Sequence, residues 1–401
     1  MSLTQLSAKS PELFYQYTIK QLVAFAGDGT LADGSKCSKE LRDYLRELPA
    51  EKLFAHVEFC LANSFDKNGF VLQDLVNELG RRLDYEVENG LYQGKHGQIG
   101  WDGIWKAPNG HSIVVEVKTT DAYRINLDTG AANYRRKLID AQQIGEESSI
   151  LIVVGRQDTG DLEAQIRGSR HAWDARIIST DALVKLVELK VNSDEDETTE
   201  KIRNLLVPFE YTRLDNIIDV MFATARDASA STIENELPSA GANAEDEEDV
   251  SYKQEHTPKA ILDEVRKNSI AALAQREGVS LIAHKRAQFW SGDKTVRAVC
   301  PVSKRYQSGG YWYAFHPHQR AFISEAVNGY LLLGCLDNDF TYALPSKVIE
   351  EVIPHLNTTE NENRKYWHIH LQRTDSGYQL LVPKKGQKLN MKKFEIRVVR
   401  K

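Results

Sequence analysis

Two short strand-like stretches joined by a tight turn constrain this chain more than any other feature. The second stretch, residues 111–118 (HSIVVEVK), is an apolar, β-branched run that ends in Glu116 and Lys118. Alternation along a strand puts these two charged residues on one face and Val117 on the other. A carboxylate and an ammonium at the end of an apolar strand are costly to bury, so their presence indicates a use.

The preceding stretch, residues 98–105, is also strand-like, and a strong turn signal at residues 108–110 (PNG) separates the two. If the stretches pair as a hairpin, the Asp102 carboxylate lies beside Glu116. Two carboxylates with a lysine next to them suit a hard divalent cation and the water that it activates. The hairpin therefore predicts a metal-dependent hydrolytic site.

Asp102, Glu116 and Lys118 resemble the active-site pattern of the PD-(D/E)XK nuclease superfamily, which includes many restriction endonucleases. That pattern is an Asp, a spacer, then Glu or Asp, any residue, and Lys at the end of the next strand. Trp101 stands where the family's name places proline, at a position that varies within the family. The resemblance covers residues 70–190.

The resemblance implies an α/β fold with a restriction-endonuclease-like mixed sheet flanked by helices. It also implies that Asp102 and Glu116 hold Mg²⁺ and that the Val117 carbonyl completes the set of protein ligands. Lys118 is then expected to orient the attacking water or to offset charge on the phosphate.

Further site residues are implied by the helices on either side of the hairpin. Members of the family often carry an auxiliary glutamate on the preceding helix, and Glu78 is the candidate here. They often place a Gln or Lys from the following helix at the site, and Gln142 is the candidate. For both residues an ordinary surface role is the alternative. Arg124, on the segment that leaves the hairpin, is a candidate phosphate contact.

The order of elements around the motif agrees with the family's core, although the motif alone does not require it. The continuous apolar run 149–154 is typical of a central strand covered on both faces. The expected elements are a helix over 70–81, strands over 85–91, 98–105 and 111–118, a helix over 131–147, a strand over 149–154, a helix over 161–171, a strand over 175–178 and a helix over 181–189.

Composition divides the 401 residues into five regions, and the 41% hydrophobic share supports more than one core. The acidic stretch 227–256 has too few apolar residues to order itself, which is typical of an interdomain linker. The expected regions are a helical N-terminal region (1–68), the nuclease-like domain (69–192), a connecting helix (193–226), the acidic linker (227–256) and a separate C-terminal α+β domain (257–401).

The net charge of −6 hides an asymmetry between the two ends of the chain. Residues 259–401 hold roughly 23 Lys and Arg against about 13 Asp and Glu, a surplus of about +10, so the remainder carries about −16. A basic region on an acidic protein suggests contact with a polyanion, and a solvated basic surface is the alternative. Aromatic rings interleave with the positive charges, as in DNA-binding surfaces, although most strand aromatics are more simply core residues. The candidate DNA-binding residues are Lys285, Arg286, Lys304, Arg305, Tyr306, Trp312 and Arg320.

Several classes of protein are disfavoured by the sequence. No apolar run approaches the roughly 20 residues that cross a bilayer, and the first residues lack a signal-peptide layout, so a cytoplasmic protein without a membrane partner is expected. The 4 cysteines are scattered, which argues against a zinc module or a disulfide framework. Four histidines at 316, 318, 368 and 370 lack a typical ligand spacing.

Together these features predict a Mg²⁺-dependent endonuclease that cleaves double-stranded DNA, of restriction or phage-defence type, with recognition by the C-terminal domain. A homodimer is expected, since each metal site hydrolyses one strand at a time. A cognate methyltransferase is left open. A structure-specific DNA repair or recombination nuclease is one alternative, and a non-catalytic DNA-binding protein is the other.

Overall fold

The computed structural model spans 401 residues and describes residues 2–93, 100–119, 126–155, 160–193, 196–208, 258–306, 309–361, 364–375 and 377–398. The chain forms two compact units, an N-terminal unit (residues 1–224) and a C-terminal unit (residues 225–401). The expected linker over 227–256 and the second half of the expected connecting helix lie outside the described residues.

A five-stranded mixed sheet in the order β1-β2-β3-β4-β5 is the framework of the N-terminal unit. Its first three strands form an antiparallel meander, and the last two join β3 in parallel. Parallel neighbours need a crossover connection, and helices α7 (Ala131–Asp140) and α8 (Gly160–Arg167) supply it. The strands are β1 (Glu86–Asn89), β2 (Gly103–Lys106), β3 (Ser112–Lys118), β4 (Ser149–Val154) and β5 (Ala175–Ser179).

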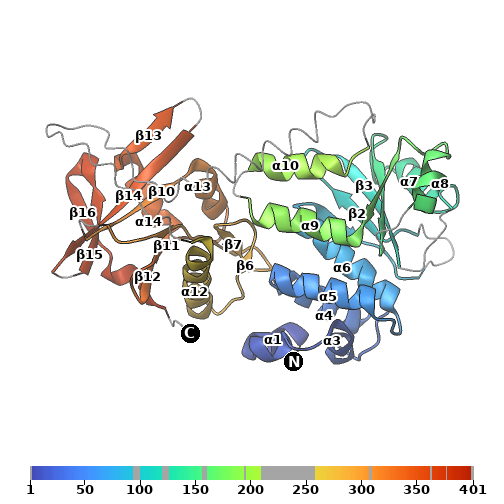
Figure 1. The fold of residues 1–401 in the computed structure, drawn as a ribbon, viewed down its shortest axis with the longest axis horizontal. Helices are drawn as coiled ribbons and strands as arrows, with labels where there is room; N and C mark the ends of the chain where they lie inside the picture. Colours follow the sequence, from blue (N-terminus) through green and yellow to red (C-terminus); the bar gives the residue numbers. More distant parts are fainter. Residues whose placement is uncertain are drawn as a thin grey trace. The chain divides into compact units, whose positions relative to one another are not determined.

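Helices cover both faces of this sheet, α7 and α8 on one and α6 (Asn68–Arg82) and α9 (Thr180–Val191) on the other (Figure 1). Alternation along β3 decides which side chains meet which helices. Val114 packs with α7, whereas Ile113 and Val115 pack in the core that α6 and α9 share. A fully buried aliphatic side chain contributes about 1.5–3 kcal/mol, so the two faces fix the register of the strand.

The N-terminal helices share one hydrophobic core with α6 and the sheet. Leu41 and Leu53, for example, belong to the same cluster as Val115 and Leu151. Residues 1–68 are therefore part of the same folding unit as the sheet and have no separate core of their own. These helices are α1 (Leu3–Lys9), α2 (Pro11–Phe14), α3 (Ile19–Phe25), α4 (Lys36–Glu47) and α5 (Ala50–Ala62), and α10 (Asp196–Leu205) joins the core from the other end of the unit.

The C-terminal unit is rich in strands and contains two sheets that pack around an aromatic core. One sheet has the order β10-β14-β15-β16, with β13 beside β14. Its strands are β10 (Tyr311–Phe315), β13 (Thr358–Asn361), β14 (Arg364–Thr374), β15 (Gly377–Val382) and β16 (Gln387–Asn390).

The other sheet has the order β17-β12-β11-β8-β7-β6, with β9 beside β11. Its strands are β6 (Ile282–Ala283), β7 (Gln288–Trp290), β8 (Val296–Val299), β9 (Val302–Ser303), β11 (Asn328–Cys335), β12 (Phe340–Pro345) and β17 (Glu395–Arg397). Its helices are α12 (Lys259–Glu277), α13 (Pro317–Ser324) and α14 (Ser346–Val352), with short 3₁₀ turns η1 (Ile353–His355), η2 (Pro383–Lys385) and η3 (Lys392–Phe394).

The mixed α/β class, the helical N-terminal region and the strand-rich C-terminal region agree with the sequence predictions, but some element limits do not. Helix α7 stops at Asp140 and not near residue 147, because Gln142 has a left-handed backbone with a φ of +56°. β2 begins only at Gly103, so Asp102 lies just outside the strand. In the described part of the chain, no helix has both the length and the apolar character needed to cross a membrane.

Candidate active site

The hairpin β2–β3 brings Asp102 and Glu116 together. Gly103 pairs with Val115, so Asp102, the residue before the strand, lies opposite Glu116. The Asp102 N–H donates to the Val115 carbonyl at 3.2 Å, and the Asp102 Oδ2 atom accepts from the Val117 N–H at 2.6 Å. The carboxylate thus continues the pairing of the two strands past the point where β2 starts.

Lys118 and Glu116 form an ion pair, with 2.5 Å between Nζ and Oε1. Their side chains are 31% and 13% exposed, so the pair lies at the edge of the protein interior and can be reached from solvent. Val117 packs against the core on the opposite face of the sheet. This is the arrangement that the alternation of β3 predicts.

The electrostatics of the site show two carboxylates with too little positive charge between them. Burial, followed by the neighbouring Glu116 carboxylate, raises the pKa of Asp102 to about 7, and the Val117 hydrogen bond and Lys118 offset only part of this. Burial disfavours the charged form of Lys118, but Glu116 outweighs it and raises the pKa of the ammonium. A further cation here would favour the ionised form of Asp102.

The backbone of Val117 shares the edge of β3 on which Asp102 lies. In a strand the N–H and C=O of one residue point to the same edge. The Val117 N–H points to Asp102, so its carbonyl also points to that edge, beyond the last residue pair of β2 and β3. Asp102, Glu116 and the Val117 carbonyl can therefore supply oxygen ligands from one location.

These oxygens fit a magnesium ion better than a transition metal. Mg²⁺ is commonly held by one or two carboxylates and keeps several waters, whereas zinc sites need more protein ligands. Among the residues that the structure describes, no group of three or more His, Cys, Asp and Glu side chains could hold a metal ion. A two-carboxylate site with a backbone carbonyl agrees with both statements.

Tyr134 of α7 lies next to the site and was not predicted. A Cβ atom added to Gly100 would lie 3.3 Å from the Tyr134 hydroxyl oxygen, and Tyr134 contributes to the raised pKa of Lys118. The N-terminal half of α7 lies close to the end of β3 because the helix starts the crossover from β3 to β4. The topology was the signal that could have found this residue.

Gln142 and Arg124 are not brought to the site in the described structure. Gln142 follows the C-terminal end of α7 and is exposed. The chain there returns to the start of β4, where Ser149 pairs with Ile113, at the opposite end of β3 from Lys118. Arg124 lies outside the described residues.

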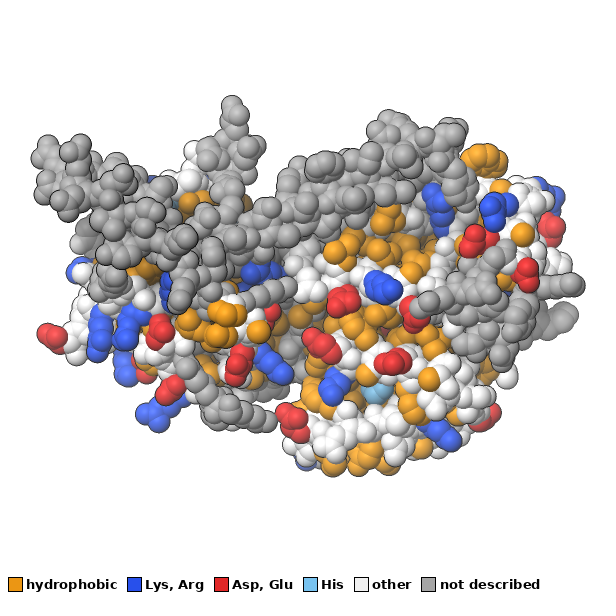
Figure 2. Space-filling model, viewed as in Figure 1, with side chains coloured by type: hydrophobic (Ala, Val, Ile, Leu, Met, Phe, Trp, Pro, Cys, Tyr) orange, Lys and Arg blue, Asp and Glu red, His pale blue; other side chains and the backbone are white. Residues whose placement is uncertain are grey.

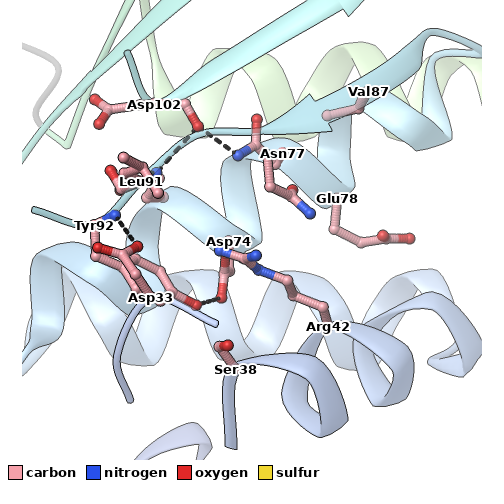
Figure 3. Close-up of polar contacts among 12 residues, drawn as sticks. Asp33, Ser38, Arg42, Asp74, Asn77, Glu78, Val87, Leu91, Tyr92 and Asp102 are labelled. Carbon is pink, nitrogen blue, oxygen red and sulfur yellow. Dashed lines mark hydrogen bonds and ion pairs between the residues drawn. The ribbon is translucent and has the colours of Figure 1, made fainter. Parts of the chain in front are cut away.

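Glu78 is buried and points away from Asp102 (Figure 3). Its carboxylate pairs with Arg82 at 2.8 Å and with Arg81 at 3.4 Å, so it is engaged within the helix. Its neighbour Asn77 does contact the hairpin, through an amide that donates to the Asp102 carbonyl at 2.8 Å.

The candidate DNA-binding residues of the C-terminal unit fall into two groups. Lys285 and Trp312 are buried, and Arg320 pairs with Glu350 through two nitrogens. These three are held by the fold. Lys304, Tyr306 and Arg286 are half-buried, although the Nε and Nη1 atoms of Arg286 are not exposed, and Arg305 is exposed.

Four histidines of the C-terminal unit, at 316, 318, 368 and 370, lie on or beside the aromatic face of the sheet with β10 and β14. His370 pairs with Trp312 across the strands. His368 lies between the Trp312 indole nitrogen at 3.3 Å and the Thr359 hydroxyl at 2.7 Å. Burial lowers the pKa of both His368 and His370. His316 and His318 stack on each other, with His316 against Tyr366.

No family model matches this chain, and a search of curated proteins finds no relative. The candidate site therefore depends on its own geometry. The observations that define it are the pairing of Asp102 with Glu116, the Lys118 ion pair and the shared edge of Val117.

Proposed function

We propose that this protein is a Mg²⁺-dependent DNA endonuclease of restriction or phage-defence type, with a restriction-endonuclease-like core. The observation that carries the proposal is that Asp102 and Glu116 lie opposite each other at the end of a hairpin, with Lys118 paired to Glu116. Acid, acid and lysine at the solvent-accessible end of a buried sheet suit hydrolysis of a phosphodiester.

Each residue has a distinct task in this reaction. Asp102, Glu116 and the Val117 carbonyl would hold Mg²⁺, which when bound activates a water and offsets negative charge on the phosphate. Lys118 is 31% exposed and can donate a hydrogen bond to the attacking water or to a phosphate oxygen. Tyr134 lies close enough to Lys118 to contribute to its raised pKa and so favours the charged ammonium.

Double-stranded DNA is the proposed substrate, and the C-terminal unit would recognise it. Figure 2 shows basic and acidic side chains interspersed over the described residues on the visible face of the N-terminal unit. The basic surplus lies in residues 259–401. This distribution supports chemistry in one unit and recognition in the other.

A two-fold dimer is the proposed active form, because each site cuts one strand of a duplex. Light scattering with and without cognate DNA tests this point. A monomer in both states that still makes double-strand breaks in one binding event would contradict it.

Plasmid cleavage in Mg²⁺ tests the proposed function directly. Unmodified and base-modified plasmids are incubated with the protein and with Asp102→Asn. Linear product made only by the unaltered protein supports the proposal. If base modification protects a plasmid from cutting, a cognate methyltransferase is expected. Preferential cutting of branched or nicked DNA favours a repair nuclease. DNA binding without cleavage in either Mg²⁺ or Mn²⁺ favours a non-catalytic protein.

A further inference from the structure

The carbonyl of Asp102 accepts three hydrogen bonds, an unusual number for a residue outside a regular strand. The donors are the Gly90 N–H at 3.0 Å, the Gln73 Nε2 at 3.1 Å and the Asn77 Nδ2 at 2.8 Å. Figure 3 shows the Asp102 carbonyl facing α6 while its carboxylate points away from that helix. The helix therefore holds the backbone and leaves the carboxylate available.

The two amides belong to successive turns of α6 and are fully enclosed. Asn77 is 0% exposed and Gln73 is 3% exposed. Buried amides are costly unless every donor and acceptor has a partner. The presence of Gln73 and Asn77 four residues apart, on one face of the helix, therefore indicates a specific task.

Neighbouring groups fix which amide atom faces Asp102. The Asn77 Oδ1 accepts from the Trp105 indole N–H at 3.0 Å, which leaves Nδ2 for the Asp102 carbonyl. The Gln73 Nε2 faces a second acceptor, the Leu91 carbonyl at 3.4 Å, so a nitrogen and not an oxygen must stand there. Neither amide can be reversed without losing hydrogen bonds.

Glycines let the backbone approach these amides closely. A Cβ atom on Gly103 would lie 2.1 Å from the Asn77 Oδ1 atom, and one on Gly80 would lie 2.5 Å from the Trp105 ring. Any side chain at either position would separate α6 from the hairpin and break the contact to Asp102.

The N-terminal helices secure both α6 and the chain segment after β1. Arg42 of α4 donates to Asp74 of α6 at 2.8 Å, and Asp74 also accepts from the Tyr92 hydroxyl. Asp33 accepts from the Tyr92 N–H at 2.7 Å (Figure 3). Because Asp74 is buried and lies one residue from Gln73, displacement of these helices would move the amides that hold Asp102.

We propose that Gln73 and Asn77 are positioning residues of the metal site: by holding the Asp102 carbonyl they set where its carboxylate stands relative to Glu116. The N-terminal helices act in the same task by fixing α6. This inference rests on the proposed function for its consequence, metal binding, but its geometric part can be tested alone.

The geometric test is hydrogen exchange at the Val117 amide in the full-length protein. That N–H donates to the Asp102 carboxylate, so its protection reports whether the carboxylate is in place. Gln73→Met keeps the length of the side chain and removes its hydrogen bonds, and Asn77→Ala is the stronger variant. Both should raise Val117 exchange by up to about tenfold, since one net hydrogen bond contributes about 1.4 kcal/mol at most and this equals a factor of ten.

Ser149→Ala is the matched control, because it also removes one buried hydrogen bond. The Ser149 hydroxyl lies 2.9 Å from the His111 ring nitrogen, at the end of β3 opposite Lys118. It should lower the melting temperature and leave Val117 exchange unchanged relative to neighbouring β3 amides. Unchanged Val117 exchange in Gln73→Met would overturn the positioning role even if Asn77→Ala fails to fold.

Metal binding separates the two proposals. Calorimetric titration of the full-length protein with Mn²⁺ should show a site that Asp102→Asn removes and that Gln73→Met weakens about 10- to 100-fold, as for other residues that orient metal ligands. Binding that Gln73→Met leaves unchanged contradicts the positioning role alone. Absence of binding in the unaltered protein contradicts the proposed function, while the Val117 result still decides the geometry.

Discussion

The two units of this protein bury their polar residues for different purposes. In the N-terminal unit, helix α6 carries several buried polar side chains, and two of them, Gln73 and Asn77, hydrogen bond to the backbone of one acidic residue. In the C-terminal unit, the histidines and Trp312 contact one another on the face of a sheet, and Arg320 is engaged by Glu350. Buried amides that hold the backbone of one acidic residue fit the proposed chemistry, whereas rings and charges spread over a sheet fit the proposed recognition.

The largest expected effect comes from removing chemistry from the N-terminal unit. Asp102→Asn, Glu116→Gln or Lys118→Ala should reduce plasmid cleavage by about 10²–10³-fold or more, because each removes a group that holds the cation or stabilises the reacting phosphate. DNA affinity, measured by a gel shift without divalent metal, should change less than about twofold.

A suitable control for these variants is Asp140→Asn, an exposed acid at the end of α7. It should cleave at the unaltered rate. Normal cutting by any of the three site variants would remove the division of labour between the units, because the chemistry would then lie elsewhere.

The second prediction separates recognition from chemistry. Residues 257–401 have hydrophobic cores of their own, so this fragment should fold and bind duplex DNA without the N-terminal unit. Its affinity should fall at least about tenfold between 50 and 200 mM salt, since each neutralised phosphate contributes about −0.9 to the logarithmic slope. Fluorescence anisotropy with a labelled duplex measures both quantities, and a folded fragment that does not bind at low salt would contradict it.

Some parts of the candidate site could be predicted from the sequence, and others could not. The hairpin was predictable because alternation and a turn at residues 108–110 are local signals, and they place Asp102 opposite Glu116. The helix α6 was also predictable. The sequence could not show that Asn77 and not Glu78 faces the hairpin, because consecutive side chains of a helix point about 100° apart. Only the packing of α6 on the hairpin selects the amide.

The positions of other site residues depended on the topology of the sheet, which no local sequence pattern contains. Gln142 lies at the far end of α7 because the crossover returns the chain to the start of β4. Tyr134, at the near end, is the residue that the same topology brings to Lys118. The burial of Lys285 was not predicted, because the short strands β6 and β7 on either side of it carry few sequence signals.

The third prediction concerns the stability of the N-terminal unit and uses its buried histidine. Burial, with a smaller contribution from Lys52, lowers the pKa of His56 to about 4, and its Nε2 atom has no hydrogen-bond partner in the described structure. The unfolded chain binds a proton near pH 6.5, so this contribution to stability is complete above pH 6.5 and is lost as the pH falls to about 4.

His56→Leu removes that titration without leaving an unsatisfied nitrogen. Between pH 7 and pH 4 the variant should lose up to about 3 kcal/mol less unfolding free energy than the unaltered protein, from 1.36 kcal/mol for each pH unit. Urea unfolding at several pH values measures the difference. His370→Leu is the counterpart in the C-terminal unit, and its half-buried site should give a smaller change. Equal slopes for His56→Leu and the unaltered protein would show that His56 is not the group responsible.

The smallest expected effect distinguishes an engaged arginine from an accessible one within the C-terminal unit. Arg320 donates from Nε to Glu350 at 2.8 Å, which neutralises its charge locally, whereas the Arg305 side chain is exposed. Arg320→Gln should therefore reduce DNA affinity less than Arg305→Gln, which should lower the salt slope by about 1 if the side chain contacts a phosphate. The stability cost of Arg320→Gln should be about 0.2–1 kcal/mol, as for other partly exposed ion pairs.

Anisotropy titrations of both variants at two salt concentrations make the comparison. A larger loss of affinity for Arg320→Gln would mean that Glu350 releases the arginine to DNA.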